Sequence, residues 1–254
     1  MQIVTLNTWG GRAGKEDLIG FFERYENDTD IFCLQEIWSA PYANQIGSIV
    51  GGTPLDPTKI MVHGLDEITA LLPDFAQYFR PHYGDHYGLL MLVKKHIEVR
   101  VEGEIFVHKY RDYVPEGDIG RHARNIQFVT THYSGSPLTI INFHGLWNGQ
   151  GKGDSEDRLS QSEKIKEFIE TLQGEVVLTG DFNLLPDTES IRILENAGLR
   201  NLVKESGVTS TRTSYYTKPE KFADYTFVSQ GLAVQEFGVL PDEVSDHAPL
   251  MLRI

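Results

Sequence analysis

Short apolar runs of strand length recur along the whole chain, separated by polar or glycine-containing turns. Two of these runs flank the sequence SGSP, whose glycine and proline are typical of a turn, so they are expected to pair as a hairpin. The runs that predict strands span residues 2–9, 30–37, 88–95, 99–107, 125–133, 138–145, 176–182, 223–229 and 248–254.

Amphipathic segments lie between some of these runs and predict helices. Residues 15–27 and 155–172 carry apolar side chains three or four positions apart, and residues 189–198 form a shorter segment. Residues 39–81 are the hardest part of the chain to interpret. There we expect a loop and then a helix near LDEITALLPDF, at residues 65–75; the glycines of this stretch lack the spacing of a phosphate-binding P-loop.

These patterns predict a single α+β domain over residues 1–254. Strands outnumber helices, and several are expected to pair as hairpins rather than through helical crossovers. Such a chain favours two mixed sheets packed face to face, with helices on the outside. The sequence contains no internal repeat, low-complexity tract or glycine- and serine-rich linker that would divide it.

Composition and cysteine content are those of an ordinary globular protein. Of the 254 residues, 40% are hydrophobic and 23% are charged, so the chain can build a substantial core. No apolar run reaches the length of a membrane span, and the first residues lack the pattern of a signal peptide. The single cysteine, Cys33, excludes an intramolecular disulfide. We therefore expect a cytoplasmic protein, with a mature secreted form as the alternative.

The net charge of −13 argues against a protein that binds nucleic acid through its overall field, since such proteins are usually basic. It does not argue against an enzyme whose acidic cleft holds a cation that in turn attracts a phosphate. Residues 108–124 mix basic side chains with tyrosines and could grip a nucleic-acid strand locally, with a solvated loop as the alternative.

Polar side chains stand where several of the predicted strands end. Capping of a turn would explain any one of them, but so many in one chain indicate a shared site. They are Asn7, Glu36, His144, Asp181, Asn183, Asp224, Asp246 and His247.

The spacing of these residues adds chemical detail. Asp181 and Asn183 are two positions apart on a chain expected to be extended, so their side chains should point the same way. Asp246 and His247 are neighbours and are expected to diverge, one toward a metal and the other toward the substrate. A hard cation such as Mg²⁺ takes one or two carboxylates and keeps other positions for water and phosphate oxygen, a demand that Glu36 and Asp246 fit.

With these residues in view, the chain resembles a known family. The motifs TLNTWGG, LQEIW, NFHG, TGDFNLLPD, FADYTFVS and SDHAPL stand in the order found in the endonuclease/exonuclease/phosphatase superfamily, which has the DNase I-like fold. GDFN followed much later by SDH is the specific part of this signal. The resemblance runs from Asn7 to Pro249 and implies a metal-dependent phosphodiesterase or phosphomonoesterase, built as a four-layer αββα sandwich.

The resemblance also implies roles around the metal. Glu36 would bind Mg²⁺ directly, with Mn²⁺ as a possible substitute, and Asn7 would lie beside it. Asp246 would complete or support metal binding. Asp181 would align or deprotonate the attacking water, and Asn183 would donate a hydrogen bond to the phosphoryl oxygen.

Histidines are implied on the substrate side of the same site. His247, held by Asp224, would act as a hydrogen-bond donor or as a general acid or base, and the carboxylate beside it would raise its pKa. His144 matches a histidine that many members place opposite it. Whether Asp181 or His247 is the base is left open.

Two further residues match positions that members use for substrate. Arg124 stands where several members have a phosphate-contacting arginine, and Tyr87 matches a frequent Tyr-Gly pair, for which packing is the alternative role. The motif FADYTF lacks the Trp-Cys-Asp-Arg element of the inositol polyphosphate phosphatases in this superfamily, which disfavours that subgroup.

The function expected from the sequence is that of a monomeric, Mg²⁺-dependent phosphoesterase, with a phosphodiesterase or nuclease preferred and nucleic acid as one possible substrate. The alternatives are a phosphomonoesterase, a sphingomyelinase-like lipid head-group phosphodiesterase and, less favoured, a non-catalytic binding protein on the same fold. Zinc and serine hydrolases are disfavoured, because HEXXH and GXSXG motifs are absent and Ser245, Asp246 and His247 are sequence neighbours.

Overall fold

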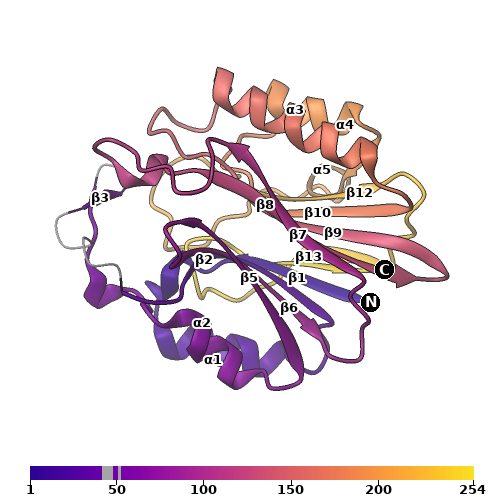
Figure 1. The fold of residues 1–254 in the computed structure, drawn as a ribbon, viewed down its shortest axis with the longest axis horizontal. Helices are drawn as coiled ribbons and strands as arrows, with labels where there is room; N and C mark the ends of the chain where they lie inside the picture. Colours follow the sequence, from indigo (N-terminus) through magenta and orange to yellow (C-terminus); the bar gives the residue numbers. More distant parts are fainter. Residues whose placement is uncertain (42–47, 51–52) are drawn as a thin grey trace.

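The computed structural model describes residues 1–41, 48–50 and 53–254, and its strands build two six-stranded mixed sheets. Part of the loop expected within residues 39–64 falls on residues 42–47 and 51–52 and lies outside the described residues. The two sheets face each other with helices on their outer surfaces (Figure 1), which confirms the predicted αββα sandwich.

The first sheet is built mainly from the N-terminal part of the chain. Its parallel pair, β1 and β2, is joined through helix α1, and the neighbouring pairs in this sheet are antiparallel. In spatial order the strands are β13 (Glu236–Val239), β14 (Leu250–Arg253), β1 (Gln2–Asn7), β2 (Ile31–Trp38), β6 (Tyr87–Lys94) and β5 (Phe75–Tyr83).

The second sheet repeats this arrangement. Strands β9 and β10 are parallel and joined through helix α3, while the hairpin expected at SGSP is present as the pair β8 and β9. In spatial order the strands are β11 (Leu199–Asn201), β12 (Asp224–Ser229), β10 (Glu175–Asp181), β9 (Ser136–His144), β8 (Arg124–Tyr133) and β7 (Val101–His108).

Helices cover the outer face of each sheet (Figure 1). Helix α1 (Lys15–Tyr25) places Leu18, Phe21 and Phe22 on one face, against Val4 and Phe32 of the first sheet. The second sheet is covered by α3 and α4. The remaining helical bounds are α2 (Gly64–Leu71), α3 (Glu156–Thr171), α4 (Glu189–Asn196) and α5 (Leu202–Glu205), with 3-10 turns at Trp9–Gly11, Pro57–Lys59 and Ile119–Arg121. Among the described residues, none of the helices combines the length and apolar character that a membrane span requires.

The space between the sheets is filled mainly by apolar side chains, and a few buried polar side chains link the two sheets. Alternate residues of the strands, such as Ile3 and Cys33 on one side and Ile140 and Val177 on the other, form a continuous inner core. Within it, Gln35 Nε2 of the first sheet donates to Asn142 Oδ1 of the second at 2.6 Å. The Asn142 amide in turn donates to the backbone oxygen of Leu34 at 3.0 Å and so binds the two sheets together.

The structure adds strands and a crossover that the sequence analysis did not predict. Strand β5, which contains Pro81, was not predicted; it lies at the edge of its sheet, where a proline is tolerated because its nitrogen needs no ladder partner. Strands β6 and β7 follow each other in the sequence but lie in different sheets, so the chain passes from one sheet to the other between them. Short strands at β3 (Ile49–Val50), β4 (Thr53–Pro54), β11 and β13 were also not predicted.

The two helical crossovers place the polar strand ends together. Strands β1 and β2 are parallel, as are β9 and β10, so the two strands of each pair end at one edge of their sheet. Asn7 ends β1, while His144 and Asp181 end β9 and β10 in direct register. Asn7 Nδ2 donates to Asp181 Oδ2 at 2.9 Å, which shows that these edges of the two sheets adjoin.

Candidate active site

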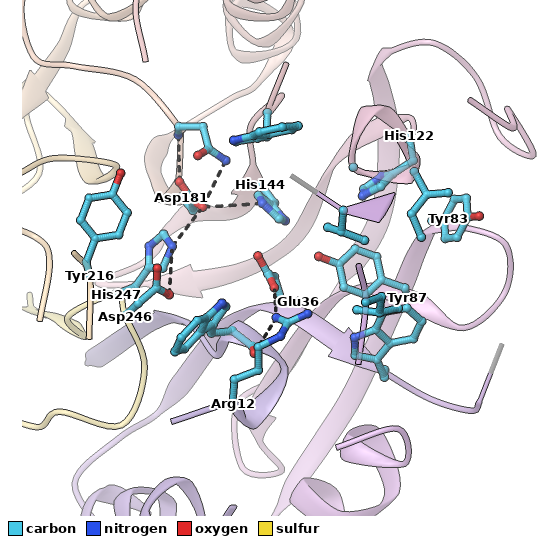
Figure 2. Close-up of a pocket in the computed structure, with 18 of the residues that line it drawn as sticks. Arg12, Glu36, Tyr83, Tyr87, His122, His144, Asp181, Tyr216, Asp246 and His247 are labelled. Atoms are coloured by element: carbon cyan, nitrogen blue, oxygen red, sulfur yellow. Dashed lines mark hydrogen bonds and ion pairs between the residues drawn. The ribbon is translucent and has the colours of Figure 1, made fainter. Parts of the chain in front are cut away.

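A pocket of about 440 Å³ opens where these two sheet edges meet. Figure 2 shows side chains from both sheets pointing into it, with Asp181 and His144 from the second sheet facing Glu36 from the first. Among its described lining residues six are basic and four are acidic, although the whole chain carries a net charge of −13. The pocket is therefore locally suited to an anion.

Asn7 links two carboxylates at the base of this pocket. Its Nδ2 donates to Glu36 Oε1 at 3.2 Å and to Asp181 Oδ2 at 2.9 Å, while its Oδ1 accepts from the backbone N–H of Trp9. The last contact fixes which end of the amide faces the carboxylates. Asn7 thus holds Glu36 and Asp181 in a defined relation to each other.

Glu36 is directed into the pocket by a local irregularity of β2. Its φ is 60°, which is rare for a residue other than glycine, and the pairing of β2 with β6 shifts register between Leu34 and Ile37. Backbone strain of this kind is kept where the surrounding structure requires it, often at functional sites. Arg12 lies 3.4 Å from Glu36 Oε2.

Asp181 and Asn183 share the same side of the chain, but for a different reason than predicted. The strand ends at Asp181, and Asn183 has a φ of 54°, so the chain turns here instead of remaining extended. The backbone N–H of Asn183 donates to Asp181 Oδ1 at 2.8 Å, and its Nδ2 lies 3.3 Å from Asp181 Oδ2. This turn directs the amide group of Asn183 beside the carboxylate.

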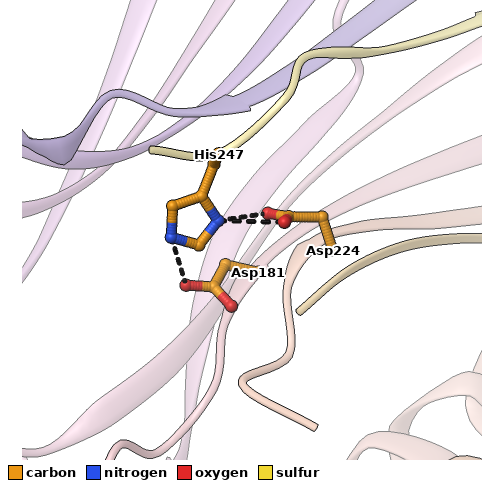
Figure 3. A group of neighbouring side chains, drawn as sticks. All are labelled: Asp181, Asp224 and His247. Atoms are coloured by element: carbon orange, nitrogen blue, oxygen red, sulfur yellow. Dashed lines mark hydrogen bonds and ion pairs between the residues drawn. The ribbon is translucent and has the colours of Figure 1, made fainter. Parts of the chain in front are cut away.

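His247 lies between two buried carboxylates (Figure 3). Its Nδ1 is 2.8 and 2.9 Å from the two oxygens of Asp224, and its Nε2 is 3.6 Å from Asp181 Oδ2. Burial and the nearby Arg212 act to lower the pKa of His247. The surrounding carboxylates, of which Asp224 is the strongest, outweigh them, so the pKa of His247 is raised.

His144 approaches the same carboxylate from the opposite side, with its Nε2 also 3.6 Å from Asp181 Oδ2. Burial, followed by the charge of Arg124, lowers the pKa of His144 well below its usual value, so this imidazole is neutral at neutral pH. Burial acts to raise the pKa of Asp181, but His247 and the other nearby groups outweigh it and the pKa is lowered. An ionised carboxylate therefore lies between one neutral imidazole and one that readily carries a proton.

Asp246 and His247 do not diverge as the sequence analysis expected. Asp246 Oδ1 lies 3.8 Å from His247 Nε2, because the chain before β14 is irregular rather than extended. Its other oxygen accepts from Arg212 at 3.0 Å. Oδ1 itself is buried and has no hydrogen-bond partner among the described side chains.

Arg124 and Tyr87 both line the pocket and are almost fully buried. Arg124 Nη1 lies 2.7 Å from Nε2 of His122, and Arg124 Nη2 donates to the backbone oxygen of Gly120 at 3.1 Å. The basic and aromatic segment at residues 108–124 is thus divided, since Arg124 turns into the pocket whereas Tyr110 is 65% exposed. A local grip on nucleic acid by this segment stays a prediction.

Lys152, Arg212 and Tyr216 also line the pocket, and sequence reasoning missed all three. The Arg212 guanidinium carbon lies 4.0 Å from the centre of the Tyr216 ring, and Lys152 Nζ lies 5.5 Å from the same centre. Lys152 stands between two glycines in the loop that follows the strand ending in His144, a pattern that sets it apart in the sequence without placing it in the pocket. Arg212 stands in a loop with no comparable signal.

Two sets of residues could hold a metal. The first is Glu36 with Asp246, which frame the pocket from two elements. The second is the buried group of Asp181, Asp224 and His247, whose ligand atoms lie within 4.8 Å of one another. In that group the Asp224 carboxylate and His247 Nδ1 already bond each other, so a cation would have to break a buried pair.

Comparison with known proteins places this geometry in a family. The profile of the Endonuclease/Exonuclease/phosphatase family matches residues 4–247. A mannosyl-6-phosphatase from Bacteroides thetaiotaomicron VPI-5482 has a similar structure, with a TM-score of 0.72 at 18% identity over 100% of this chain and 98% of that one. A conserved protein of unknown function from Enterococcus faecalis V583 also has a similar structure. Its TM-score is 0.71 at 21% identity, over 100% of this chain and 98% of that one.

A third similar structure is TDP2 of D. rerio in complex with a single-strand DNA product, with a TM-score of 0.65 at 16% identity over 99% of this chain and 97% of that one. No curated protein matches the sequence. At these identities the structural likeness establishes the fold alone.

Proposed function

The chain belongs to the endonuclease/exonuclease/phosphatase family, and on that premise we propose that its pocket hydrolyses a phosphoester with the aid of a divalent cation. Members of this family are phosphoric ester hydrolases. The observation that carries the proposal is the position of Asp181, whose Oδ2 lies 3.6 Å from the Nε2 atoms of both His144 and His247 inside the pocket.

The divalent cation would be held by Glu36 and Asp246, with Asn7 beside them. The buried Oδ1 of Asp246, which has no hydrogen-bond partner among the described side chains, fits this role, as does the strained backbone that directs Glu36 into the pocket. Mg²⁺ suits such a site because it takes one or two carboxylates and keeps water or phosphate oxygen as its other ligands. When bound, Mg²⁺, or Mn²⁺ in its place, would stabilise negative charge on the phosphoryl oxygens.

Asp181 and His247 divide the proton transfers. The ionised Asp181 orients a water molecule and takes its proton as the water oxygen bonds to phosphorus. The bond from phosphorus to the ester oxygen breaks, and the protonated His247 supplies the proton that this leaving oxygen takes up. Return of the proton from Asp181 to His247, across the 3.6 Å between them, restores the starting state.

Neutral and cationic donors around these two residues would hold the phosphoryl group. Asn183 Nδ2 and His144 Nε2 both flank Asp181 and could donate to a phosphoryl oxygen. Arg124 is buried at the pocket wall with its Nε unpartnered among the described residues, which suits a phosphate contact. Tyr87 lies at the same wall and would limit the space open to the leaving group.

The sequence favoured a phosphodiester or nucleic-acid substrate, and the similar TDP2 structure holds a DNA product. Phosphomonoester hydrolysis is the second candidate, and a specific observation favours it. In the pocket, Arg12 pairs with Glu36 and Arg212 pairs with Asp246. The buried Lys152 lines the same pocket, and its Nζ has no hydrogen-bond partner among the described residues. One similar structure is named as a mannosyl-6-phosphatase.

Hydrolysis of p-nitrophenyl phosphate and bis-p-nitrophenyl phosphate tests the proposal directly. Wild type with Mg²⁺ or Mn²⁺ should hydrolyse at least one of them, and EDTA should abolish the reaction. Asp181→Asn should lower kcat by about 10²-fold or more, since it removes the base. Asp187→Asn, an exposed aspartate a few residues away, is the matched control. Equal rates for wild type and Asp181→Asn would overturn the proposal.

A further inference from the structure

Lys152 is a buried cation that no carboxylate of the described residues pairs with. The residue is 7% exposed and lines the pocket, and its Nζ has no hydrogen-bond partner among the described residues. Burying an ammonium group in this way costs free energy unless an anion meets it. Burial, followed by the charge of Arg212, accordingly lowers the pKa of Lys152 to about 8.

The loop that carries Lys152 is built to hold it there. The buried Arg158 donates to the backbone oxygens of Gly151 and Gly153, which flank Lys152, and to that of Leu146. The backbone oxygen of Lys152 itself accepts from the N–H of Leu185 at 2.9 Å. These contacts fix the backbone at Lys152 and thereby the point from which its side chain enters the pocket.

Arg212 adds a second buried cation on the same side. Its side chain is 4% exposed and lies over the Tyr216 ring, which Lys152 also approaches. One guanidinium nitrogen is taken by Asp246, but Nε is buried without a partner among the described residues. Asp246 in turn lies 3.8 Å from His247 Nε2, so Arg212, and Lys152 at the same Tyr216 ring, lie on the catalytic side of the pocket.

We propose that Lys152, backed by Arg212 over Tyr216, binds the second negative charge of a phosphomonoester and thereby makes the enzyme prefer monoesters to diesters. This inference rests on the proposed phosphoesterase function. At neutral pH a monoester carries up to one more negative charge on its phosphoryl oxygens than a diester does. Arg12 and Arg212 each have a carboxylate partner within the protein, whereas Lys152 has none among the described residues.

A second phosphate of a nucleic-acid strand is the competing occupant of this position. The net charge of −13 disfavours it, because the overall field of the chain repels a polyanion. A single terminal phosphate enters the locally basic pocket without that penalty. Lys152 is thus a specificity residue that touches the phosphoryl oxygens, and catalysis of water attack remains with Asp181 and His247.

The test compares kcat/KM for p-nitrophenyl phosphate, bis-p-nitrophenyl phosphate and the p-nitrophenyl ester of thymidine 5′-phosphate. Wild type should prefer the monoester. Lys152→Met should lower the monoester value by about 10- to 100-fold, as expected for loss of a charged hydrogen bond, and change the diester values by less than about threefold. Lys152→Arg should retain the preference, and Lys204→Met, which removes an exposed lysine, should match wild type.

Binding of inorganic phosphate gives a readout independent of turnover. Phosphate should raise the Tm of wild type and of Lys152→Arg, and this rise should be absent in Lys152→Met at the same concentration. A wild type that prefers either diester, or a Lys152→Met variant that loses all three activities equally, would overturn the inference while leaving the phosphoesterase function standing. Absence of hydrolysis with every substrate and metal would instead overturn the proposed function.

Discussion

His247 Nδ1 lies 2.8 Å from Asp224 Oδ1, and both side chains are buried. The contact determines which imidazole nitrogen faces the pocket, since Nδ1 is occupied and only Nε2 points toward Asp181. It also supplies the largest of the charges that raise the pKa of His247. The pair therefore sets both the direction and the charge of the group that we propose as the acid.

Asp224→Asn should weaken this acid without disrupting the contact, because the amide oxygen can still accept from Nδ1–H. Loss of the carboxylate charge lowers the pKa of His247, so the protonated form is lost at a lower pH. We expect kcat/KM at pH 7.5 to fall by about 10²-fold and the alkaline limb of its pH profile to move to lower pH. An unshifted profile would show that Asp224 has only a structural role.

Glu36→Gln should raise the Mg²⁺ concentration needed for half-maximal activity by about tenfold or more, because an amide oxygen is a weaker ligand than a carboxylate. The fold should persist, since Asn7 Nδ2 can donate to the amide oxygen as it does to Glu36 Oε1. Activity is measured across a Mg²⁺ titration, with exposed Glu23→Gln as the control. An unchanged Mg²⁺ dependence would place the cation elsewhere, with the Asp181, Asp224 and His247 group as the next candidate.

Buried neutral histidines should make the protein sensitive to mild acid. Burial, followed by Arg124, lowers the pKa of His82 to about 3 and that of His122 well below 6.5. Below pH 6.5 the unfolded chain binds a proton at each, but the folded chain does not, so the free energy of unfolding decreases as the pH falls. The slope approaches about 1.4 kcal/mol per pH unit for each histidine.

Urea unfolding between pH 7.5 and 5 measures this slope. His82→Gln should reduce the pH dependence of the free energy of unfolding by the contribution of one histidine, because glutamine does not titrate. The exposed His132→Gln should leave it unchanged. A stability that stays level over this range would mean that the folded protein accepts protons at these sites.

Gly180→Ala should destabilise the protein by about 3 kcal/mol or more. Gly180 has a φ of 137°, and a Cβ there would lie 2.1 Å from the backbone oxygen of Phe143 on the neighbouring strand. Because Gly180 precedes Asp181, the same close approach also positions the carboxylate. Gly20→Ala is the control, since a Cβ there meets nothing within 4 Å and alanine favours the helix by up to about 1 kcal/mol.

The sequence was informative wherever a polar residue ended an apolar strand. Asn7, His144 and Asp181 could be placed together because strand ends in such sheets converge, and that pattern is visible without coordinates. Lys152 and Arg212 could not be placed in the site from the sequence. Both lie in loops, and the course of a loop depends on long-range contacts such as those of Arg158. The backbone turn at Asn183 was likewise invisible, because it depends on a local hydrogen bond to Asp181 rather than on periodicity.

The edge of the first sheet was missed for a related reason. Strand β5 mixes half-buried residues with Pro81 and lacks the clean alternation that identifies a strand. Its neighbour β6 is buried and apolar as far as Val93 and was predicted readily. Predictability thus followed burial, being highest in the central strands and lowest at sheet edges and in the loops that surround the pocket.

The amide pair of Gln35 and Asn142 has a consequence for how the pocket works. It crosses the sandwich one residue before Glu36 and two before His144, so sliding of one sheet past the other would break buried hydrogen bonds close to the reacting groups. The charges are thereby held in place before any substrate arrives, and the proposed attack on phosphorus would require little reorganisation free energy.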